Sequence, residues 1–445
     1  MPRWNLVWLV GVPFTILLAL AIGYGAPPLR GEHPDAELVR ILVDVLGEVD
    51  RSYVRELDDA GRRKLVEDMI NGGLERLDPH STFFNAYEYR QFDRKSEGKF
   101  GGIGIQVSQD RTAGTMTVTA PMVGTPAYEA GILAGDRIVK IDGRPLDILK
   151  PDEAIDLIQG DPGTIVTLTI ERGGSPSLTE LTITRAIVEI ETVLGDRRNP
   201  LDPKEWEFTI DGEANVALIR LTEFDKPTAP TLKQVLDRLD ATGVRGLVLD
   251  LRGNPGGLLV SSVEIADLFL ADGKVVSTRG RKGNEKVYTA RKDGTPFERA
   301  DRPIAVLTDR YSASASEIVA AALQDHDRAV VVGERTYGKG SVQEIYTLAN
   351  HSVALKLTTQ SYWRPSGKNI HRFPDSNEAD DWGVRPSAGF AVELSEDERR
   401  VWAAARRARD VVRGKGNEQP AGPPIIDKVL DRALSYVRGE LAKRN

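Results

Sequence analysis

The sequence of 445 residues contains no cysteine and only five histidines. Without cysteine, disulfides, thiolate nucleophiles, Cys-ligated zinc and iron–sulfur clusters are excluded. The histidines show no H-E-x-x-H spacing, so a histidine-rich metal site lacks its usual ligands. We therefore expect no metal or other cofactor, and any hydrolytic chemistry has to use hydroxyls, carboxylates and amines.

An excess of positive charge is also lacking. Lysine and arginine number 59 against 66 aspartates and glutamates, for a net charge of −7. Without a long basic block, this balance does not favour a nucleic-acid surface. The hydrophobic share of 40% and charged share of 28% are typical of a globular chain rather than a disordered or multi-span membrane protein.

One long uncharged run stands at the N-terminus. No charged residue lies between Trp4 and Pro28, and Leu6 to Ile22 is almost continuously apolar. Residues 1–30 are therefore predicted to be a signal peptide or a membrane anchor, and the sequence leaves cleavage open. Arg3 precedes the run and acidic residues follow it, so we expect an exported protein of the cell envelope or periplasm, held at the inner membrane if the segment is retained.

The hydrophobic period changes several times along the chain. Leu38, Ile41, Leu42 and Val45 recur at helical spacing and form a stripe that suits either a core or a dimer face, whereas apolar residues alternate after Lys99. Strand and helix patterns then alternate, as in an α/β layer. We predict an α+β multidomain fold with a helical N-terminal segment at 35–95, a β-rich domain at 99–188, an α/β layered core at 200–390 and a helical C-terminal extension at 391–445.

Two glycine-rich segments resemble known motifs but lack the decisive residue. Gly333 to Gly340 almost spells a phosphate-binding loop, but Gly340 stands where that loop needs Ser or Thr. In the second segment, Pro255 stands where a chymotrypsin-like protease has its serine. Gly256 and Gly257 could still let a substrate carbonyl approach backbone N–H groups, as in an oxyanion hole, or could simply form a tight turn.

Three serines separated by alanines lie between an expected strand at 304–308 and an expected helix. Ser316, followed by Glu317, is typical of a helix cap, which leaves Ser312 and Ser314 for other roles. Taken alone, the segment is a capping sequence rather than a catalytic one.

A lysine flanked by glycines follows the next apolar strand. Partial burial of Lys339 would lower its pKa, as a general base requires, and no His–Asp pair is apparent as an alternative base for a serine. The competing interpretation is a glycine turn with a solvated lysine.

The β-rich domain opens with a further glycine-rich loop, whose backbone N–H groups could hold a peptide C-terminal carboxylate beside a strand edge open to β-augmentation. Downstream pairs such as Ala130-Gly131 and the segment Gly135 to Ile138 complete a constellation that resembles a PDZ domain over 99–188. The candidate peptide-binding residues are Gly101, Gly102, Ile103, Gly104 and Ile105.

A PDZ-like domain followed by Leu251 to Gly257, Ser312 to Glu317 and Tyr337 to Gln343 resembles the carboxyl-terminal processing protease family, also called tail-specific proteases. The resemblance covers roughly residues 40 to 390, and departs at the insertion 371–382 and at Ser387, where an Asp is expected. It implies a catalytic set and an oxyanion hole, in which Ser314 is the nucleophile, Lys339 the base and Gln343 the residue that orients the lysine, with N–H groups from Ala315 and from Gly256 or Gly257.

The resemblance further implies a serine endopeptidase that binds unstructured, apolar protein C-termini through its PDZ domain and cleaves with a Ser–Lys dyad. A homo-oligomer through the N- or C-terminal helices is left open. The alternatives are a catalytically silent PDZ adaptor, which would need none of Ser314, Lys339 and Gln343, and an HtrA-like protease, which would need a serine at position 255.

Overall fold

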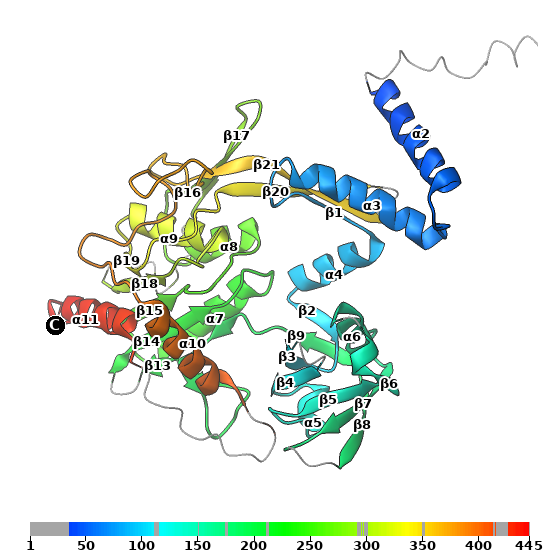
Figure 1. Cartoon of the computed structure of the whole chain (residues 1–445). Helices are drawn as coiled ribbons and strands as arrows, with labels where there is room; N and C mark the ends of the chain where they lie inside the picture. The colour runs from blue at the N-terminus through cyan, green and yellow to red at the C-terminus, as the bar shows by residue number, and fades with distance from the viewer. Residues whose placement is uncertain are drawn as a thin grey trace, which may run out of the picture. The chain divides into compact units, whose positions relative to one another are not determined.

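The computed structural model describes residues 35–110, 115–149, 151–173, 177–210, 213–291, 295, 297, 301–348, 352–412, 414 and 426–444. The predicted signal or anchor at 1–30 lies outside these residues. Within them, no helix combines the length and apolarity needed to cross a membrane. The chain divides into a unit up to Gly73 and a larger one from Leu74 onward. The smaller unit holds α2 (Ala36–Ser52) and most of α3 (Asp59–Glu75) (Figure 1).

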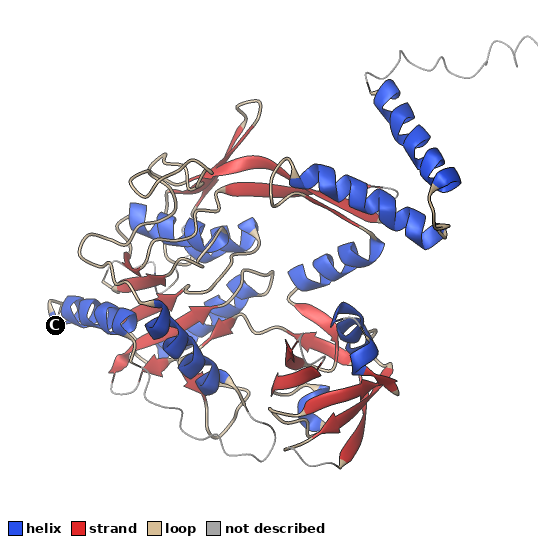
Figure 2. Cartoon of the chain, viewed as in Figure 1, coloured by secondary structure: helices blue, strands red, loops and turns tan. Residues whose placement is uncertain are grey.

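The predicted β-rich domain is a PDZ-type sheet closed by two helices (Figure 2). Its strands run in the order β3-β4-β5-β7-β8, so β3 is an edge strand, and its core is built from alternating inward residues such as Val166, Leu168 and Ile170. Its elements are β2 (Lys99–Gly102), β3 (Ile105–Asp110), β4 (Thr115–Pro121), α5 (Pro126–Glu129), β5 (Arg137–Ile141), β6 (Arg144–Pro145), α6 (Pro151–Ile158), β7 (Ile165–Glu171), β8 (Leu178–Thr184) and β9 (Ala186–Glu189).

The α/β core is built on a sheet of order β10-β14-β15-β18-β19, in which the last four strands are parallel. Strands β15 and β18 are buried along their whole length, the pattern expected when both faces of a parallel sheet are covered. These strands are β10 (Val193–Leu194), β14 (Glu213–Leu221), β15 (Gly246–Asp250), β18 (Ile304–Thr308) and β19 (Val330–Gly333), with β13 (Thr209–Ile210) also paired to β14.

Helices cover this sheet on two sides. One hydrophobic cluster joins it to α7 (Thr228–Ala241), α8 (Leu259–Asp267) and α9 (Ala315–Asp325), and a separate cluster joins its other face to α11 (Lys428–Ala442). The predicted α/β layer is therefore confirmed. The C-terminal helix α11 is a layer of this core, not a tail beside it, because Val429, Ala433 and Val437 pack against the strands.

A second sheet of order β1-β21-β16-β17, with β20 paired to β21, completes the core. Its strands are β1 (Thr82–Phe84), β16 (Lys274–Gly280), β17 (Glu285–Thr289), β20 (Ser341–Leu348) and β21 (Val353–Trp363). The remaining elements are α4 (Ala86–Ser96), β11 (Arg197–Arg198), β12 (Trp206–Glu207) and α10 (Glu396–Asp410).

Candidate active site

Three loops that carry the predicted site residues leave the C-terminal ends of neighbouring parallel strands. The turn 253–257 follows β15, the serine turn 309–314 follows β18, and the lysine turn 336–340 follows β19. Parallel strands place such loops along one edge of the sheet, where open α/β sheets bind ligands. Segments that are more than 80 residues apart along the chain are thus brought to one edge.

The hydroxyls of two serines are used structurally. Ser312 Oγ donates to the carbonyl of Leu251 at 2.8 Å and accepts from the backbone N–H of Asp309 at 3.0 Å. Ser316 Oγ donates to the carbonyl of Asn254 at 3.0 Å. Both serines are fully buried, so these hydroxyls bind the serine turn to the neighbouring loop and are not presented to a substrate.

Ser314 is placed differently. It is 7% exposed and has a φ of +57°, a conformation that a non-glycine residue adopts only under strain and that is common at functional turns. Burial raises the pKa of the nearby Tyr362, so its phenol is neutral, and Ser314 opposes this rise. Ser314 is also the N-cap of α9. The prediction that Ser316 caps this helix was wrong, because the helix begins at Ala315.

The buried carboxylate of Glu317 joins the serine and lysine turns. Its Oε2 accepts the backbone N–H groups of Ser314 and Lys339, each at 2.8 Å, and its Oε1 accepts from Thr336 Oγ1 at 2.5 Å and Gly338 N at 2.7 Å. Burial raises the pKa of Glu317 to about 7 despite these four donors. Because one oxygen atom binds both N–H groups, the backbones of Ser314 and Lys339 lie side by side.

Lys339 has the environment of a base. Burial, followed by the nearby charge of Lys356, lowers its pKa below the ordinary 10.5, and Glu317 opposes this change. Burial and the charge of Lys339 also lower the pKa of His80. The low pKa values show that cations are disfavoured around the lysine turn, as a neutral amine requires.

The turn at Gly256 touches the serine directly. A Cβ on Gly256 would lie 2.8 Å from Ser314 Cβ and 2.9 Å from Ala315 N, so only glycine fits here. The N–H of Gly256 donates to the side chain of Asn254 at 2.8 Å. Among the described residues, the N–H groups of Gly257 and Ala315 have no acceptor. The sequence left open whether Gly256 or Gly257 supplies an N–H group to the oxyanion hole. Gly257 is the one whose N–H group is free among the residues that the structure describes.

Gln343 lies on β20 beside the lysine turn, and its contacts are with hydroxyls. Its Nε2 donates to Ser341 Oγ at 2.9 Å and to Thr358 Oγ1 at 3.1 Å, and Thr358 Oγ1 donates in turn to Asp78 at 3.0 Å. None of the contacts found within the described ranges is a hydrogen bond from Gln343 to Lys339. The Leu77–Ser81 segment and Thr358 thus belong to the surroundings of the base.

A cleft of about 1170 Å³ opens beside the lysine turn. Asp78, His80, Tyr337, Lys339 and His371 are among its lining residues. This is large enough for several residues of an extended peptide, since ligand pockets commonly hold 300–1000 Å³.

The candidate peptide-binding loop precedes the edge strand of the PDZ-type sheet. Gly101 and Gly102 end β2, Ile103 is buried, and Ile105 begins β3. In the described part of the chain, no acceptor is found for the N–H groups of Ile103 and Gly104. The loop therefore has free donors at the end of an open strand edge.

Sequence reasoning missed the parts that connect the site. Glu317 had a signal, because a lone acid among Ile and Ala on a buried helix face must be paired. The insertion at 371–382 was recognised only as a departure from the family pattern, and the structure shows that it packs on the lysine turn: Arg372 N donates to the Gly338 carbonyl at 2.8 Å, and Trp382 lies 3.0 Å from where a Gly338 Cβ would be.

Comparison with known proteins agrees with this arrangement. Peptidase family S41 matches residues 215–377, and the PDZ domain family matches residues 117–172. The Carboxy-terminal-processing protease of Bartonella bacilliformis is 36% identical over 413 residues, which cover 89% of this chain and 88% of that protein. This chain belongs to the carboxyl-terminal processing protease family. It is accordingly a serine peptidase with a PDZ domain.

Two further comparisons give lower identities. The Carboxy-terminal processing protease CtpA of Bacillus subtilis is 32% identical over 327 residues, which cover 73% of this chain and 65% of that protein. Among solved structures, the photosystem II D1 C-terminal processing protease is 26% identical, aligns over 80% of this chain and 92% of its own, and gives a TM-score of 0.43.

Proposed function

We propose that this protease is an endopeptidase that cleaves with a dyad of Ser314 and Lys339 after its PDZ domain has bound a protein C-terminus. The observation that carries the dyad is the shared carboxylate oxygen: Glu317 Oε2 accepts both backbone N–H groups at 2.8 Å. Among the described contacts, Ser314 Oγ donates to no backbone carbonyl, unlike the hydroxyls of Ser312 and Ser316.

The chemistry follows from these positions. Neutral Lys339 takes the proton of Ser314 Oγ as this oxygen attacks the scissile carbonyl carbon. The N–H groups of Ala315 and Gly257 donate to the oxyanion that forms. The lysine then returns the proton to the leaving amine, and water hydrolyses the acyl-enzyme. Gln343 supports the hydroxyl network next to Lys339.

The test is cleavage of a folded protein that carries an unstructured, apolar C-terminal tail. Mass spectrometry of the products should show internal cuts with the wild type and intact substrate with Ser314→Ala. Ser435→Ala, which removes an exposed serine hydroxyl from α11, serves as the matched control. Cleavage by Ser314→Ala at the wild-type rate would overturn the dyad, and tail binding without cleavage by the wild type would favour an adaptor.

The tail-binding part rests on the loop before β3. A peptide added to this edge strand would bring its terminal carboxylate to the free N–H groups of Ile103 and Gly104. Amidation of the peptide C-terminus removes the charge, so we expect binding to weaken by about 1–3 kcal/mol. Calorimetric titration of the Ser314→Ala protein with free and amidated peptides measures this. Equal affinities would contradict carboxylate capture.

A further inference from the structure

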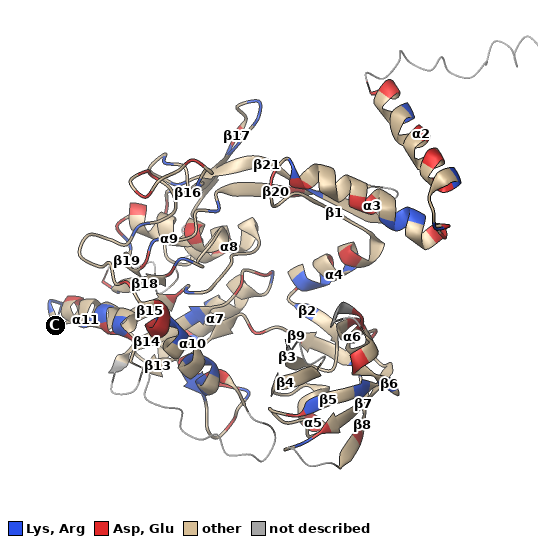
Figure 3. Cartoon of the chain, in the orientation of Figure 1, with Lys and Arg blue, Asp and Glu red and all other residues tan. Residues whose placement is uncertain are grey.

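Arginine side chains tie the C-terminal extension to the core. Figure 3 shows basic residues along α10, and their side chains bind acids of the core: Arg399 pairs with Glu334 at 3.0 Å, and Arg406 and Arg409 pair with Asp196. In a further ion pair the arginine belongs to the core and the acid to the extension. Here the acid, Asp427, comes from the extension, where it caps α11.

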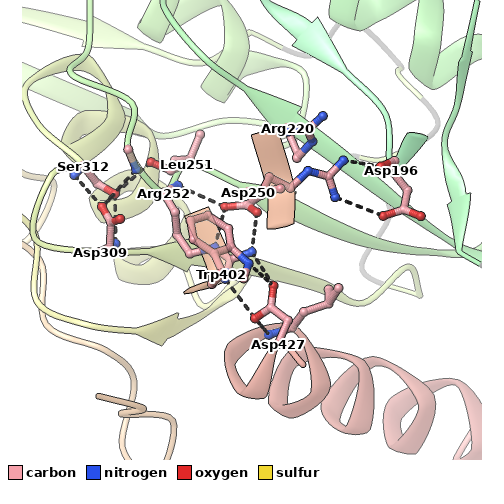
Figure 4. Close-up of polar contacts among 12 residues, drawn as sticks. Asp196, Arg220, Asp250, Leu251, Arg252, Asp309, Ser312, Trp402 and Asp427 are labelled. Carbon is pink, nitrogen blue, oxygen red and sulfur yellow. Dashed lines mark hydrogen bonds and ion pairs between the residues drawn. The ribbon is translucent and has the colours of Figure 1, made fainter. Parts of the chain in front are cut away.

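Arg252, the partner of Asp427, immediately precedes the turn 253–257. Its guanidinium donates to both oxygens of Asp427 at 2.9 Å, and to Asp250 at 2.9 and 2.6 Å (Figure 4). Its side chain is only 4% exposed. The ring of Trp402, on α10, lies 4.3 Å from the guanidinium, and its Nε1 donates to Asp427 at 2.9 Å. A residue of α10 and the residue that caps α11 therefore both contact the Arg252 side chain.

That side chain is linked through the backbone to the serine. The next residue, Gly253, donates its N–H to Asp309 Oδ1 at 3.0 Å, and the same oxygen accepts the N–H groups of Tyr311 and Ser312 at 2.9 and 3.0 Å (Figure 4). Asn254, one residue further, accepts Ala313 N at its carbonyl at 3.0 Å. A shift of Arg252 would thus move the turn 253–257, here called the oxyanion turn, relative to Ser314.

We propose that Asp427 is a positioning residue for the oxyanion turn, so that the C-terminal extension completes the active site through Arg252. This inference rests on the proposed function, because it assumes that Ser314 and the N–H of Gly257 act on one carbonyl. Losing the Asp427 charge leaves a buried guanidinium with one fewer carboxylate and frees it to move. The step that suffers is stabilisation of the oxyanion, not binding of the substrate.

The experiment compares Asp427→Asn with Asp196→Asn. Both variants neutralise a buried acid paired with the arginines described above, but Asp196 has no described contact with the turn. We expect Asp427→Asn to lower kcat about tenfold or more with KM unchanged, and to weaken binding of a peptide aldehyde by a similar factor while binding of the product peptide is unchanged. Asp196→Asn should keep the wild-type kcat.

Equal losses of kcat in the two variants, or an unchanged kcat in Asp427→Asn, would overturn the inference. If Asp427→Asn does not fold, Trp402→Phe decides, because it removes one hydrogen bond to Asp427 and keeps the aromatic ring: a lower kcat at constant KM supports the inference, and wild-type kinetics contradict it. An inactive wild type would instead contradict the proposed function, so the two failures are distinguishable.

Discussion

The serine turn and the lysine turn are held in different ways. The serine turn is fixed partly by close neighbours in sequence, since Asp309 binds the N–H groups of Tyr311 and Ser312, and partly by the preceding loop, since the Asn254 carbonyl accepts Ala313 N. The lysine turn is fixed by residues far along the chain, since Thr336 and Val384 exchange hydrogen bonds, Thr336 N with the Val384 carbonyl and Val384 N with Thr336 Oγ1. Local contacts thus help to place the nucleophile, whereas the base is placed by tertiary contacts.

The largest effect is expected where the two turns act together. Ser314→Ala and Lys339→Ala should each lower kcat by several orders of magnitude, and the double variant should be little worse, because the two side chains form one nucleophilic unit. Steady-state kinetics on a tailed protein substrate measure this. Independent, multiplying effects would show that the residues do not work as a dyad.

A methyl group added between the turn 253–257 and the serine turn should be the next most damaging change. Gly256→Ala places a Cβ 2.6 Å from the Ala313 carbonyl oxygen and 2.8 Å from Ser314 Cβ, so the turn has to move. We expect kcat to fall by about 10²-fold, as on loss of an oxyanion donor.

Gly253→Ala is the matched control for this change. Gly253 also has a positive φ, of +70°, but a Cβ there meets nothing within 4 Å. It should cost about 1–2 kcal/mol of stability and lower kcat less than Gly256→Ala does. Similar kcat values in the two alanine variants would contradict direct contact at Gly256.

Removing the Glu317 carboxylate, which joins the serine and lysine turns, should have a smaller effect on kcat and a distinct effect on stability. Glu317→Gln turns an amide NH2 toward at least one of the three N–H donors that the carboxylate binds, so the serine and lysine turns should be held together less firmly and kcat should fall about tenfold or more. The pKa of Glu317 is raised to about 7 in the folded protein, from 4.5 in the unfolded chain. At pH values between the two, the folded protein holds a proton that the unfolded chain has lost. The free energy of unfolding of the wild type should therefore fall as the pH rises from 4.5 to 7, by an amount on the order of 3 kcal/mol.

Denaturant unfolding at several pH values measures this difference. Glu317→Gln should lack this part of the pH dependence because its side chain does not titrate. If the slope between pH 4.5 and 7 persists in the variant, Glu317 is not its source.

The smallest effects on rate are expected at the two structural serines. Ser312→Ala and Ser316→Ala remove bonds to the carbonyls of Leu251 and Asn254, so each should cost about 1–3 kcal/mol of stability. Their kcat should stay within about tenfold of the wild type. Should either variant prove as inactive as Ser314→Ala, the choice within the triplet is wrong.

The same comparison shows what the sequence could predict. The α/β layer and the three loops followed from strand patterns and motifs, because apolar runs and glycine turns are local signals. Ser316 was mistaken for the cap, since Ser-Glu is typical of a helix start, whereas the strained backbone of Ser314 depends on the packing of Gly256 against it. The docking of Asp427 on Arg252, 175 residues apart, has no local signal at all.

The central claim, that neutral Lys339 activates Ser314, is tested most directly by the pH dependence of serine acylation. The rate of labelling by a fluorophosphonate, located by peptide mass spectrometry, should rise with pH on Ser314, with a midpoint below 10.5, because burial lowers the pKa of Lys339 and only the neutral amine accepts the proton. Lys339→Arg should not be labelled, since a guanidinium keeps its charge. A label on Ser312 or Ser316, or an unchanged profile in Lys339→Arg, would contradict the account.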